Sequence, residues 1–190
     1  MSAAARVVSE MGETHARIED FIAAAGISRG TFYNYYGTRE ELLDDLWKRV
    51  GSEPFHDIQL ASQTIEDPAE RFGTEARLIL ARAARDPTWG WLVYSMSDLS
   101  KVPSDLLSYP RPDLVIGHRS GRFRFTNLDC ANDMAVSTLR RALRGVLEQD
   151  RTDDYALGMV EMLLRALGIS DEEAKMIATQ PLAVAPEKPS

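Results

Sequence analysis

The sequence predicts an all-α fold, and three observations carry that prediction. Apolar residues recur at spacings of three and four along nearly the whole chain, which is the periodicity of an amphipathic helix. Alternation with a period of two is scarce, and its nearest example, residues 122–125, is too short to build a sheet. Glycines, prolines and capping residues divide the chain at intervals typical of helix ends.

The composition indicates a folded globular protein. The chain has 190 residues, of which 44% are hydrophobic and 27% charged, and a disordered chain is less apolar. A membrane-spanning helix needs about 18 consecutive apolar residues, and no apolar run in the sequence is that long, so we expect no membrane contact. Residues 1–12 lack the pattern of a secretory signal. One cysteine, Cys130, excludes an intramolecular disulfide framework; we expect it to be buried and the protein to be cytoplasmic.

The charge distribution is more informative than the net charge of −7. An acidic total argues against a protein coated along its length by nucleic acid, but it leaves room for a small basic face. Residues 1–50 carry a net charge of −2, yet residues 21–39 contain no acidic side chain. This stretch is a local electropositive region with two arginines and three tyrosines: Arg29, Arg39, Tyr33, Tyr35 and Tyr36.

Capping signals predict four helices in the first fifty residues. The first covers residues 3–11 and ends at Gly12, and the second covers residues 18–25 and ends at Gly26. Ser28 caps a third helix through Tyr36, because its hydroxyl can accept a hydrogen bond from a free backbone N–H. Thr38 caps a fourth, with Glu41 as capping-box partner, which ends near Val50 or continues, kinked, past Pro54 to Ser62.

Longer helices follow in the rest of the chain. Pro68 suits the first turn of a helix to Arg85, and Pro87 opens another. Prolines and glycines predict short helices and turns over residues 97–122. Two strong helices are expected over residues 128–149 and 153–167, and Ser170 with Glu173 predicts a last short helix to Thr179.

Residues 18–36 fit a helix-turn-helix, in which two short helices are held at a fixed angle by a tight turn. Five apolar residues can form the small core that sets this angle: Phe21, Ile22, Ala25, Ile27 and Phe32. The exposed face of the second helix then presents Arg29, Thr31, Tyr33 and Asn34, side chains that reach base edges and phosphates. Gly30 has no side chain, so a DNA backbone can approach closely there.

Residues 25–42, Ala-Gly-Ile-Ser-Arg-Gly-Thr-Phe-Tyr-Asn-Tyr-Tyr-Gly-Thr-Arg-Glu-Glu-Leu, resemble the signature of the tetracycline-repressor (TetR/AcrR) regulators almost position for position. The resemblance implies an all-helical homodimer whose three N-terminal helices bind double-stranded DNA. It also implies a larger C-terminal domain that binds a small-molecule effector and then releases the DNA. The resemblance assigns DNA contacts to the recognition helix and its cap, Ser28, Arg29, Gly30, Thr31, Tyr33, Asn34 and Tyr35.

Two arginines complete the expected DNA interface. Arg39 matches a basic residue that grips phosphate at the start of the family's fourth helix. Arg17 stands where the family usually has a threonine that caps the second helix, and its charge can also reach a phosphate. The chain further departs from the family by beginning its first helix at the start of the sequence, without a preceding basic arm.

The expected domains are residues 1–46 for DNA binding, residues 47–180 for effector binding and dimerisation, and a flexible tail over residues 181–190. Aromatic and sulfur-containing residues of the second domain, with one histidine, could line an apolar effector pocket or simply pack in the core. These residues are Phe55, Trp89, Trp91, Tyr94, Met96, Tyr109, His118, Phe125 and Met134.

The two closing helices are each apolar over a wide face, which predicts one neighbour in the same chain and one in a partner. We therefore expect a two-fold four-helix interface, with a monomer as the alternative. The expected interface residues are Leu139, Leu143, Val146, Met159, Met162 and Leu163.

These features predict a ligand-responsive transcriptional repressor that leaves a palindromic operator when it binds a small apolar or amphipathic effector. The alternative is a helical small-molecule-binding or interaction protein with a vestigial DNA-binding module, which the short first helix and the net charge of residues 1–50 motivate. The three histidines, His15, His56 and His118, are too scattered for a metal site, and we expect no cofactor. No catalytic triad is visible in the sequence, so an enzyme has no positive support.

Overall fold

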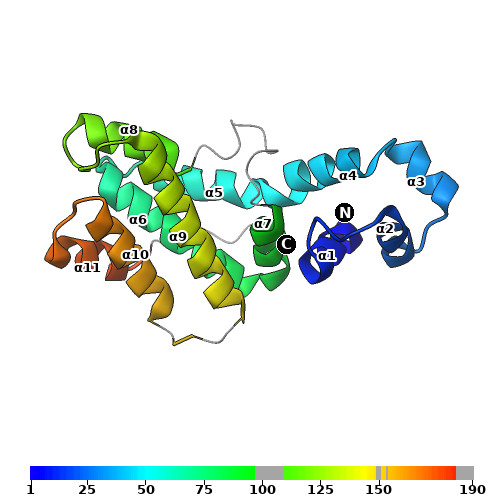
Figure 1. The fold of residues 1–190 in the computed structure, drawn as a ribbon. Helices are drawn as coiled ribbons and strands as arrows, with labels where there is room; N and C mark the ends of the chain where they lie inside the picture. Colours follow the sequence, from blue (N-terminus) through cyan, green and yellow to red (C-terminus); the bar gives the residue numbers. More distant parts are fainter. Residues whose placement is uncertain (97–108, 149–150, 153, 183–190) are drawn as a thin grey trace.

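The computed structural model describes residues 1–96, 109–148, 151–152 and 154–182, with the side chain of Met96 left out. Every regular element in these residues is helical, which confirms the all-α prediction. Three short helices form one end of the molecule (Figure 1): α1 (Ser2–Met11), α2 (Ile18–Ala25) and α3 (Arg29–Tyr35). From them α4 (Arg39–Leu46) leads towards the larger C-terminal part.

The C-terminal part is built around one long helix, α6, which contacts six of its neighbours. Its elements are α5 (Glu53–Ser62), α6 (Pro68–Arg85), α7 (Pro87–Met96), α8 (Arg111–Arg119), α9 (Leu128–Glu148), α10 (Tyr155–Ala166) and α11 (Asp171–Thr179). Asp67 caps α6 by accepting a hydrogen bond of 3.1 Å from the N–H of Ala69. Phe72, Ala76 and Ala83 are fully buried along it, so apolar burial holds the other helices around α6.

A single turn of π-helix, η1 (Trp47–Gly51), interrupts the path from α4 to α5. The interruption of the helix that was expected at Pro54 therefore lies earlier in the chain, at η1. Pro54 itself is in the first turn of α5, where its missing N–H costs no helical hydrogen bond. Gly51 makes the turn possible, since a Cβ there would overlap the ring of Trp47. Such π-turns often occur at functional positions of a helix.

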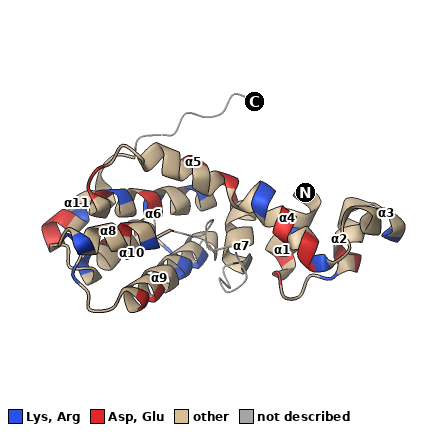
Figure 2. Cartoon of the chain, turned by 90° about the horizontal axis from the view of Figure 1, so that it is seen from above, with Lys and Arg blue, Asp and Glu red and all other residues tan. Residues whose placement is uncertain are grey.

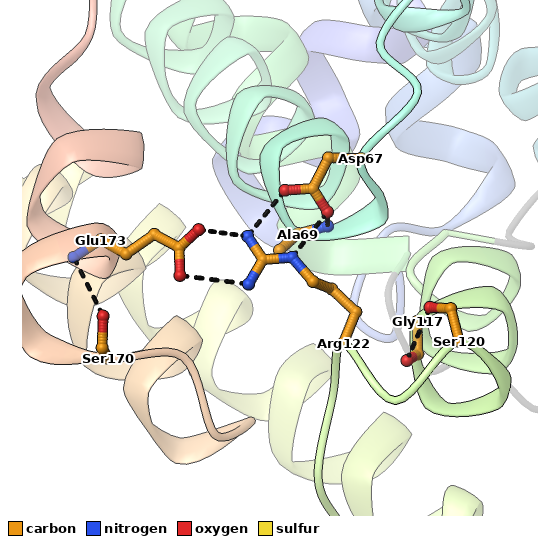
Figure 3. Close-up of polar contacts among 7 residues, drawn as sticks. All are labelled: Asp67, Ala69, Gly117, Ser120, Arg122, Ser170 and Glu173. Atoms are coloured by element: carbon orange, nitrogen blue, oxygen red, sulfur yellow. Dashed lines mark hydrogen bonds and ion pairs between the residues drawn. The ribbon is translucent and has the colours of Figure 1, made fainter.

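Arg122 joins three distant segments of the C-terminal part (Figure 3). Its guanidinium pairs with Asp67 before α6 and with Glu173 in α11, at Nη2–oxygen distances of 2.7 and 2.5 Å. The same contact lowers the pKa of Asp67 below its usual range, because the guanidinium stabilises the carboxylate. Glu173 also takes part in the cap that opens α11, where its N–H donates to Ser170 Oγ. The expected Ser170 cap is thus confirmed, and Glu173 connects it to the ion pairs of Arg122.

Some sequence expectations need correction. Helix α3 ends at Tyr35, because Tyr36 has extended backbone angles and serves as its C-cap. Cys130 is exposed, since it lies in the first turn of α9, where Asn127 Oδ1 accepts its N–H. The expected helix boundaries at Gln149 and Asp153, and the expected turns over residues 97–108, lie outside the described residues. Within the described part of the chain, no helix has both the length and the apolar character to cross a membrane.

Candidate nucleic-acid interface

The turn between α2 and α3 is held by glycine geometry and by a serine cap. Gly26 adopts a left-handed conformation, with φ of 62°, which L side chains rarely adopt. Ser28 Oγ then accepts a hydrogen bond of 3.0 Å from the N–H of Thr31 and opens α3. Phe21 and Phe32, each 3% exposed, anchor the two helices in the core. Ala25 and Ile27 were expected in this core, but both are exposed because they lie at the outer side of the turn.

The outer face of α3 carries the side chains predicted to contact DNA. Tyr35 is 76% exposed and Tyr33 44% exposed, and Arg29 and Asn34 are also exposed. Thr31 is half-buried, with its hydroxyl 2.8 Å from Ser28 Oγ. Figure 2 shows α3 at the tip of the molecule, away from the acidic residues of α4. The structure thus gathers these residues on one solvent-facing helix.

Arg29 has two weak neighbours that leave its guanidinium accessible. It lies 3.6 Å from Glu19, in a pair whose side chains are both more than half exposed, and 5.9 Å from the centre of the Tyr33 ring. An exposed ion pair of this kind contributes little stability, so a phosphate or a base edge can replace Glu19.

Gly30 has no role in packing. A Cβ at this position would meet only Ser28 Oγ, at 3.8 Å, which is an ordinary contact. Glycine inside a helix costs about 0.5–1 kcal/mol relative to alanine. The fold therefore gives no reason for a glycine here, whereas close approach of a partner would.

The two remaining predicted contacts differ in their surroundings. Arg17 is exposed, and its backbone N–H donates to Asp20 Oδ2 at 2.8 Å as the helix begins. Arg39 is turned inward: its Nε donates to the carbonyl of Ala16 at 2.7 Å, and its Nη2 donates to the carbonyl of Glu13. Its observed contacts fasten the α1–α2 connection to α4, so the expected grip on phosphate is not what positions this side chain.

A partly buried hydrogen bond joins the C-terminal end of helix α3 to α4. Tyr36 Oη donates to Asp45 Oδ2 at 2.7 Å, and Arg49 Nε donates to Asp45 Oδ1 at the same distance. Both bonds lower the pKa of Asp45, because each stabilises the carboxylate, and the bond to Asp45 together with partial burial raises the pKa of Tyr36. The Tyr36–Asp45 bond therefore fastens the C-terminal end of the recognition helix to α4.

The far end of α4 is joined to α7. Trp89 is 2% exposed, and its Nε1 donates a hydrogen bond of 3.1 Å to the carbonyl of Gly51 in η1. The ring of Phe55 lies between Trp89 and Trp47, with centroid distances of 5.5 and 6.1 Å. Helix α1 also packs on α7, so the N-terminal helices contact the C-terminal part at two places.

The residues predicted to line an effector pocket occur in separate ring pairs. Phe55 contacts Trp89, Trp91 contacts Tyr94, and His118 stacks on Phe125 at 4.4 Å. Tyr109 stacks instead on Phe72, at 5.8 Å, and Met134 packs against the core. The side chain of Met96 lies outside the described part.

A group of mostly buried polar residues lies between α5, α6 and α8, and the sequence had singled out only Tyr109 among them. Its members are Ser62, Arg71, Glu75, Tyr109 and Asp113. Ser62, Glu75 and Asp113 are 1%, 6% and 5% exposed, and burial raises the pKa of Glu75 to about 7. The signal in the sequence was the pair Arg71 and Glu75, one helical turn apart among the apolar residues of α6.

The expected dimer residues are placed unevenly. Leu143 and Leu163 are 4% and 2% exposed, so they pack inside their own chain and offer little surface to a partner. Leu139, Val146 and Met159 are partly buried, and Met162 is 66% exposed. Val146 also lines a groove of about 540 Å³ between α6, α9 and α10. The described residues hold no group of three or more His, Cys, Asp or Glu side chains that could bind a metal ion.

Comparison with known proteins places both parts of the chain. Residues 1–46 match the family model of bacterial regulatory proteins of the tetR family, and residues 67–180 match the tetracyclin repressor-like C-terminal domain. The structure is similar to RolR in complex with its ligand resorcinol, with 28% identity, a TM-score of 0.74, and 97% of this chain and 93% of RolR covered.

Two further structures show how widely the fold is shared. RolR without ligand is 27% identical, with a TM-score of 0.73 and 95% of each chain covered. FadR from Bacillus subtilis, in complex with stearoyl-CoA, is 20% identical with a TM-score of 0.66, and the alignment covers 89% of this chain and 97% of FadR. No curated protein sequence matches this chain. Because the two family models together span most of its length, the chain belongs to the TetR family of regulatory proteins.

Proposed function

We propose that this TetR-family regulator is a homodimeric, cytoplasmic transcriptional repressor that leaves a palindromic operator when a small molecule binds its C-terminal domain. The carrying observation is the outer face of α3. Its side chains Arg29, Tyr33, Asn34 and Tyr35 are exposed, and the chain itself makes little use of them. Arginine can pair with guanine and asparagine with adenine, while tyrosine hydroxyls can reach phosphates.

Gly30 supports DNA as the partner of this face. The fold has room for a side chain at this position and would gain helix stability from alanine. Because Gly30 has no side chain, a phosphate can approach the backbone closely near the N-terminus of α3, and helix N-termini attract phosphate.

A two-fold dimer would supply the second recognition helix. Met162 and the partly buried Met159 offer an apolar surface on α10, which suits a four-helix contact with α9 and α10 of a partner. Two recognition helices then enter successive major grooves about 34 Å apart, so the operator is a palindrome.

Effector release requires that the ligand prefer one spacing of the recognition helices over the other. The route we propose runs from α7 through the Trp89–Gly51 hydrogen bond to η1, then along α4 to the Tyr36–Asp45 bond and α3. RolR binds resorcinol, and its likeness over nearly the whole chain supports a small effector in this protein as well.

Selection of genomic DNA fragments by the purified protein, followed by footprinting, tests the proposal. We expect enrichment of a palindromic sequence with two protected half-sites one helical turn apart, and no such enrichment with Arg29→Ala. Failure of the wild-type protein to enrich any sequence would favour the alternative, a small-molecule-binding protein with a vestigial DNA-binding module.

A further inference from the structure

We propose that the groove between α6, α9 and α10 binds an organic anion, namely a monocarboxylate with a compact aliphatic body. The groove has a volume of about 540 Å³, which falls within the range of about 300–1,000 Å³ that is typical of small-molecule sites. The proposal rests on the proposed function, because it names the site and the chemical class of the effector. Its supports are a buried cation, an uncapped helix N-terminus and an aliphatic wall.

Arg77, in the middle of α6, is a buried cation that lines this groove and is 8% exposed. Its Nη1 donates to the carbonyl of Ile177 at 3.0 Å and its Nη2 to the carbonyl of Gln180 at 2.5 Å, so it fastens the end of α11. Its Nε has no hydrogen-bond partner. Burial lowers the pKa of Arg77, and no charged group in the described residues offsets this effect. Because an uncompensated buried charge is costly, a bound carboxylate would supply the missing counter-charge.

The N-terminus of α10 forms another part of the wall. Thr152, before the helix, and Tyr155, Ala156 and Leu157, in its first turn, all line the groove. No side chain in the described residues caps this helix end, and its first turn contains no acidic residue. The first N–H groups of a helix have no partner within it and attract anions. The N-cap residue, Asp154, accepts a hydrogen bond from the Thr152 hydroxyl at 2.5 Å and is not among the residues that line the groove.

The charge of the groove selects an anion. Its described lining includes two arginines, Arg77 and Arg151, and no acidic side chain, although the whole chain has a net charge of −7. Arg151 is exposed and lies 5.5 Å from the centre of the Tyr155 ring. A cationic ligand would meet two like charges, and a neutral one would leave Arg77 uncompensated. A carboxylate, by contrast, can accept charge-assisted hydrogen bonds from a guanidinium.

The rest of the wall is mostly aliphatic and indicates the shape of the ligand. Leu80, Val146, Leu157 and Leu182 contribute to it, together with small alanines, and Tyr155 is the only aromatic residue in the described lining. An aliphatic body would remove this surface from water, which is favourable in proportion to the area buried. A bare anion such as acetate or phosphate would leave the same surface hydrated. The groove therefore calls for a ligand that has both a carboxylate and an aliphatic body.

The groove adjoins the contact that holds α7. A Cβ at Gly90 of α7 would meet Leu147 Cδ2 at 2.7 Å and Ala83 Cβ at 2.9 Å, so α7 packs closely against α9 and α6 at this point. The adjacent residues of these two helices, Val146 and Ala84, line the groove. A ligand that favours one spacing of α6 and α9 would thereby act on α7, where the proposed route to the DNA-binding helices begins.

Calorimetric titration of the full chain with matched cyclohexane derivatives tests the proposal. The probes are cyclohexanecarboxylate, its neutral carboxamide and cyclohexylamine, with acetate and inorganic phosphate as anions that lack the aliphatic body. We expect cyclohexanecarboxylate to bind at least about tenfold more tightly than each of the others. Equal or tighter binding of any other probe would overturn the proposal. So would a lack of carboxylate binding, which is the result expected if a second copy of the chain covers the groove.

Two pairs of variants connect the binding to this groove. Arg77→Gln should weaken cyclohexanecarboxylate binding at least about tenfold, whereas Arg85→Gln, at an exposed position of the same helix, should leave it unchanged. Ala84→Glu and Ala84→Gln keep Arg77 and its bonds to α11, and Ala84 is an exposed residue of the groove wall. The glutamate should weaken carboxylate binding at least about tenfold relative to the glutamine, because it adds a like charge. Equal affinities of these two variants would overturn the proposal even if Arg77→Gln folds poorly.

DNA selection separates this proposal from the proposed function. If the protein enriches a palindrome but cyclohexanecarboxylate does not bind, or binds independently of Arg77 and Ala84, the regulator stands and this site assignment fails. If the carboxylate binds through these positions but no DNA is enriched, the groove stands as a carboxylate site and the repressor proposal fails.

Discussion

The indole Nε1 of Trp89 donates a hydrogen bond of 3.1 Å to the carbonyl oxygen of Gly51. Gly51 closes the π-turn that follows α4, and Trp89 lies on α7, so this bond joins the helix that carries the DNA-binding domain to the C-terminal core. A π-turn leaves main-chain carbonyls outside the regular helical pattern, and the indole satisfies one of them. In the proposed repressor this contact is where a change around the effector would reach α4.

Replacing this indole should separate ligand binding from DNA release. Trp89→Phe keeps an aromatic ring in the buried site and removes the donor to Gly51. We expect effector affinity and DNA affinity, measured separately, to change little. The factor by which bound effector weakens DNA binding, typically about 5–150-fold in allosteric proteins, should fall towards about onefold. Fluorescence anisotropy of labelled DNA with and without effector measures both. Trp91→Phe, at a half-buried position on the same helix, is the control and should keep the coupling.

The π-turn should not tolerate a side chain at its glycine. In Gly51→Ala the added methyl group would overlap the buried ring of Trp47, so we expect a loss of about 1–3 kcal/mol in the free energy of unfolding. Gly158→Ala offers a matched control inside α10, because a Cβ there meets nothing within 4 Å. Urea denaturation should show this control to be as stable as the wild type or more so; equal stability of both variants would mean that the turn can open without cost.

Gly30 should matter to DNA and not to the fold. Gly30→Ala adds a methyl group that meets only Ser28 Oγ in the chain, so thermal stability should stay level or rise slightly. If a phosphate approaches this backbone, affinity for the selected DNA should fall by about tenfold. Anisotropy titration checks the affinity, and an unaltered value would remove Gly30 from the interface.

The Arg122 network should stabilise the protein at neutral pH and lose its effect in acid. Arg122 lowers the pKa of Asp67, so the stabilisation is present above the ordinary value of about 3.9 and is lost as pH falls through the lower folded value. Arg122→Met should therefore cost about 1–2 kcal/mol near neutral pH, and this cost should shrink below about pH 4. Arg119→Met, at an exposed position of α8, should behave like the wild type throughout. A cost independent of pH would assign the role of Arg122 to packing alone.

Glu75 should give the opposite pH dependence at a higher pH. Its pKa is about 7 in the folded chain and near 4.3 when unfolded, so the native state holds the extra proton between these values. Stability should fall by on the order of 3 kcal/mol as pH rises through this window, with Arg71, Asp113 and Tyr109 as the groups that face the carboxyl. Glu75→Gln should flatten the profile, measured by urea denaturation at about pH 5 and about pH 8. A variant with the wild-type slope would place the titration elsewhere.

Local signals in the sequence were enough for most of the helices and for the exposed face of α3. Ser28, Thr38 and Ser170 cap the helices they were expected to cap. A hydroxyl just before a helix can accept a hydrogen bond from a backbone N–H of the first turn that has no partner within the helix. The expected exposure of Arg29, Tyr33 and Asn34 agrees with the buried position of Phe32 in the same helix, whereas Thr31, expected on the same face, is half-buried.

Features that depend on distant contacts were missed. The Arg39 side chain turns inward because it donates hydrogen bonds to the carbonyls of residues 13 and 16. These carbonyls are far from Arg39 in the sequence, so local sequence patterns do not predict the contact. Cys130 was expected to be buried from its residue type, yet the first turn of α9 points it outward. The pairing of Arg71 with Asp113 spans about forty residues, so the buried polar cluster was visible only once α6 and α8 were packed together.

Binding of the selected genomic fragment by Arg29→Ala and Tyr33→Ala tests the DNA-binding claim most directly. Both side chains are exposed, so circular dichroism and thermal unfolding should match the wild type. If the outer face of α3 contacts DNA, each variant loses at least about tenfold in affinity at the same salt concentration, with a weaker salt dependence for Arg29→Ala. Wild-type affinity in both folded variants would contradict it.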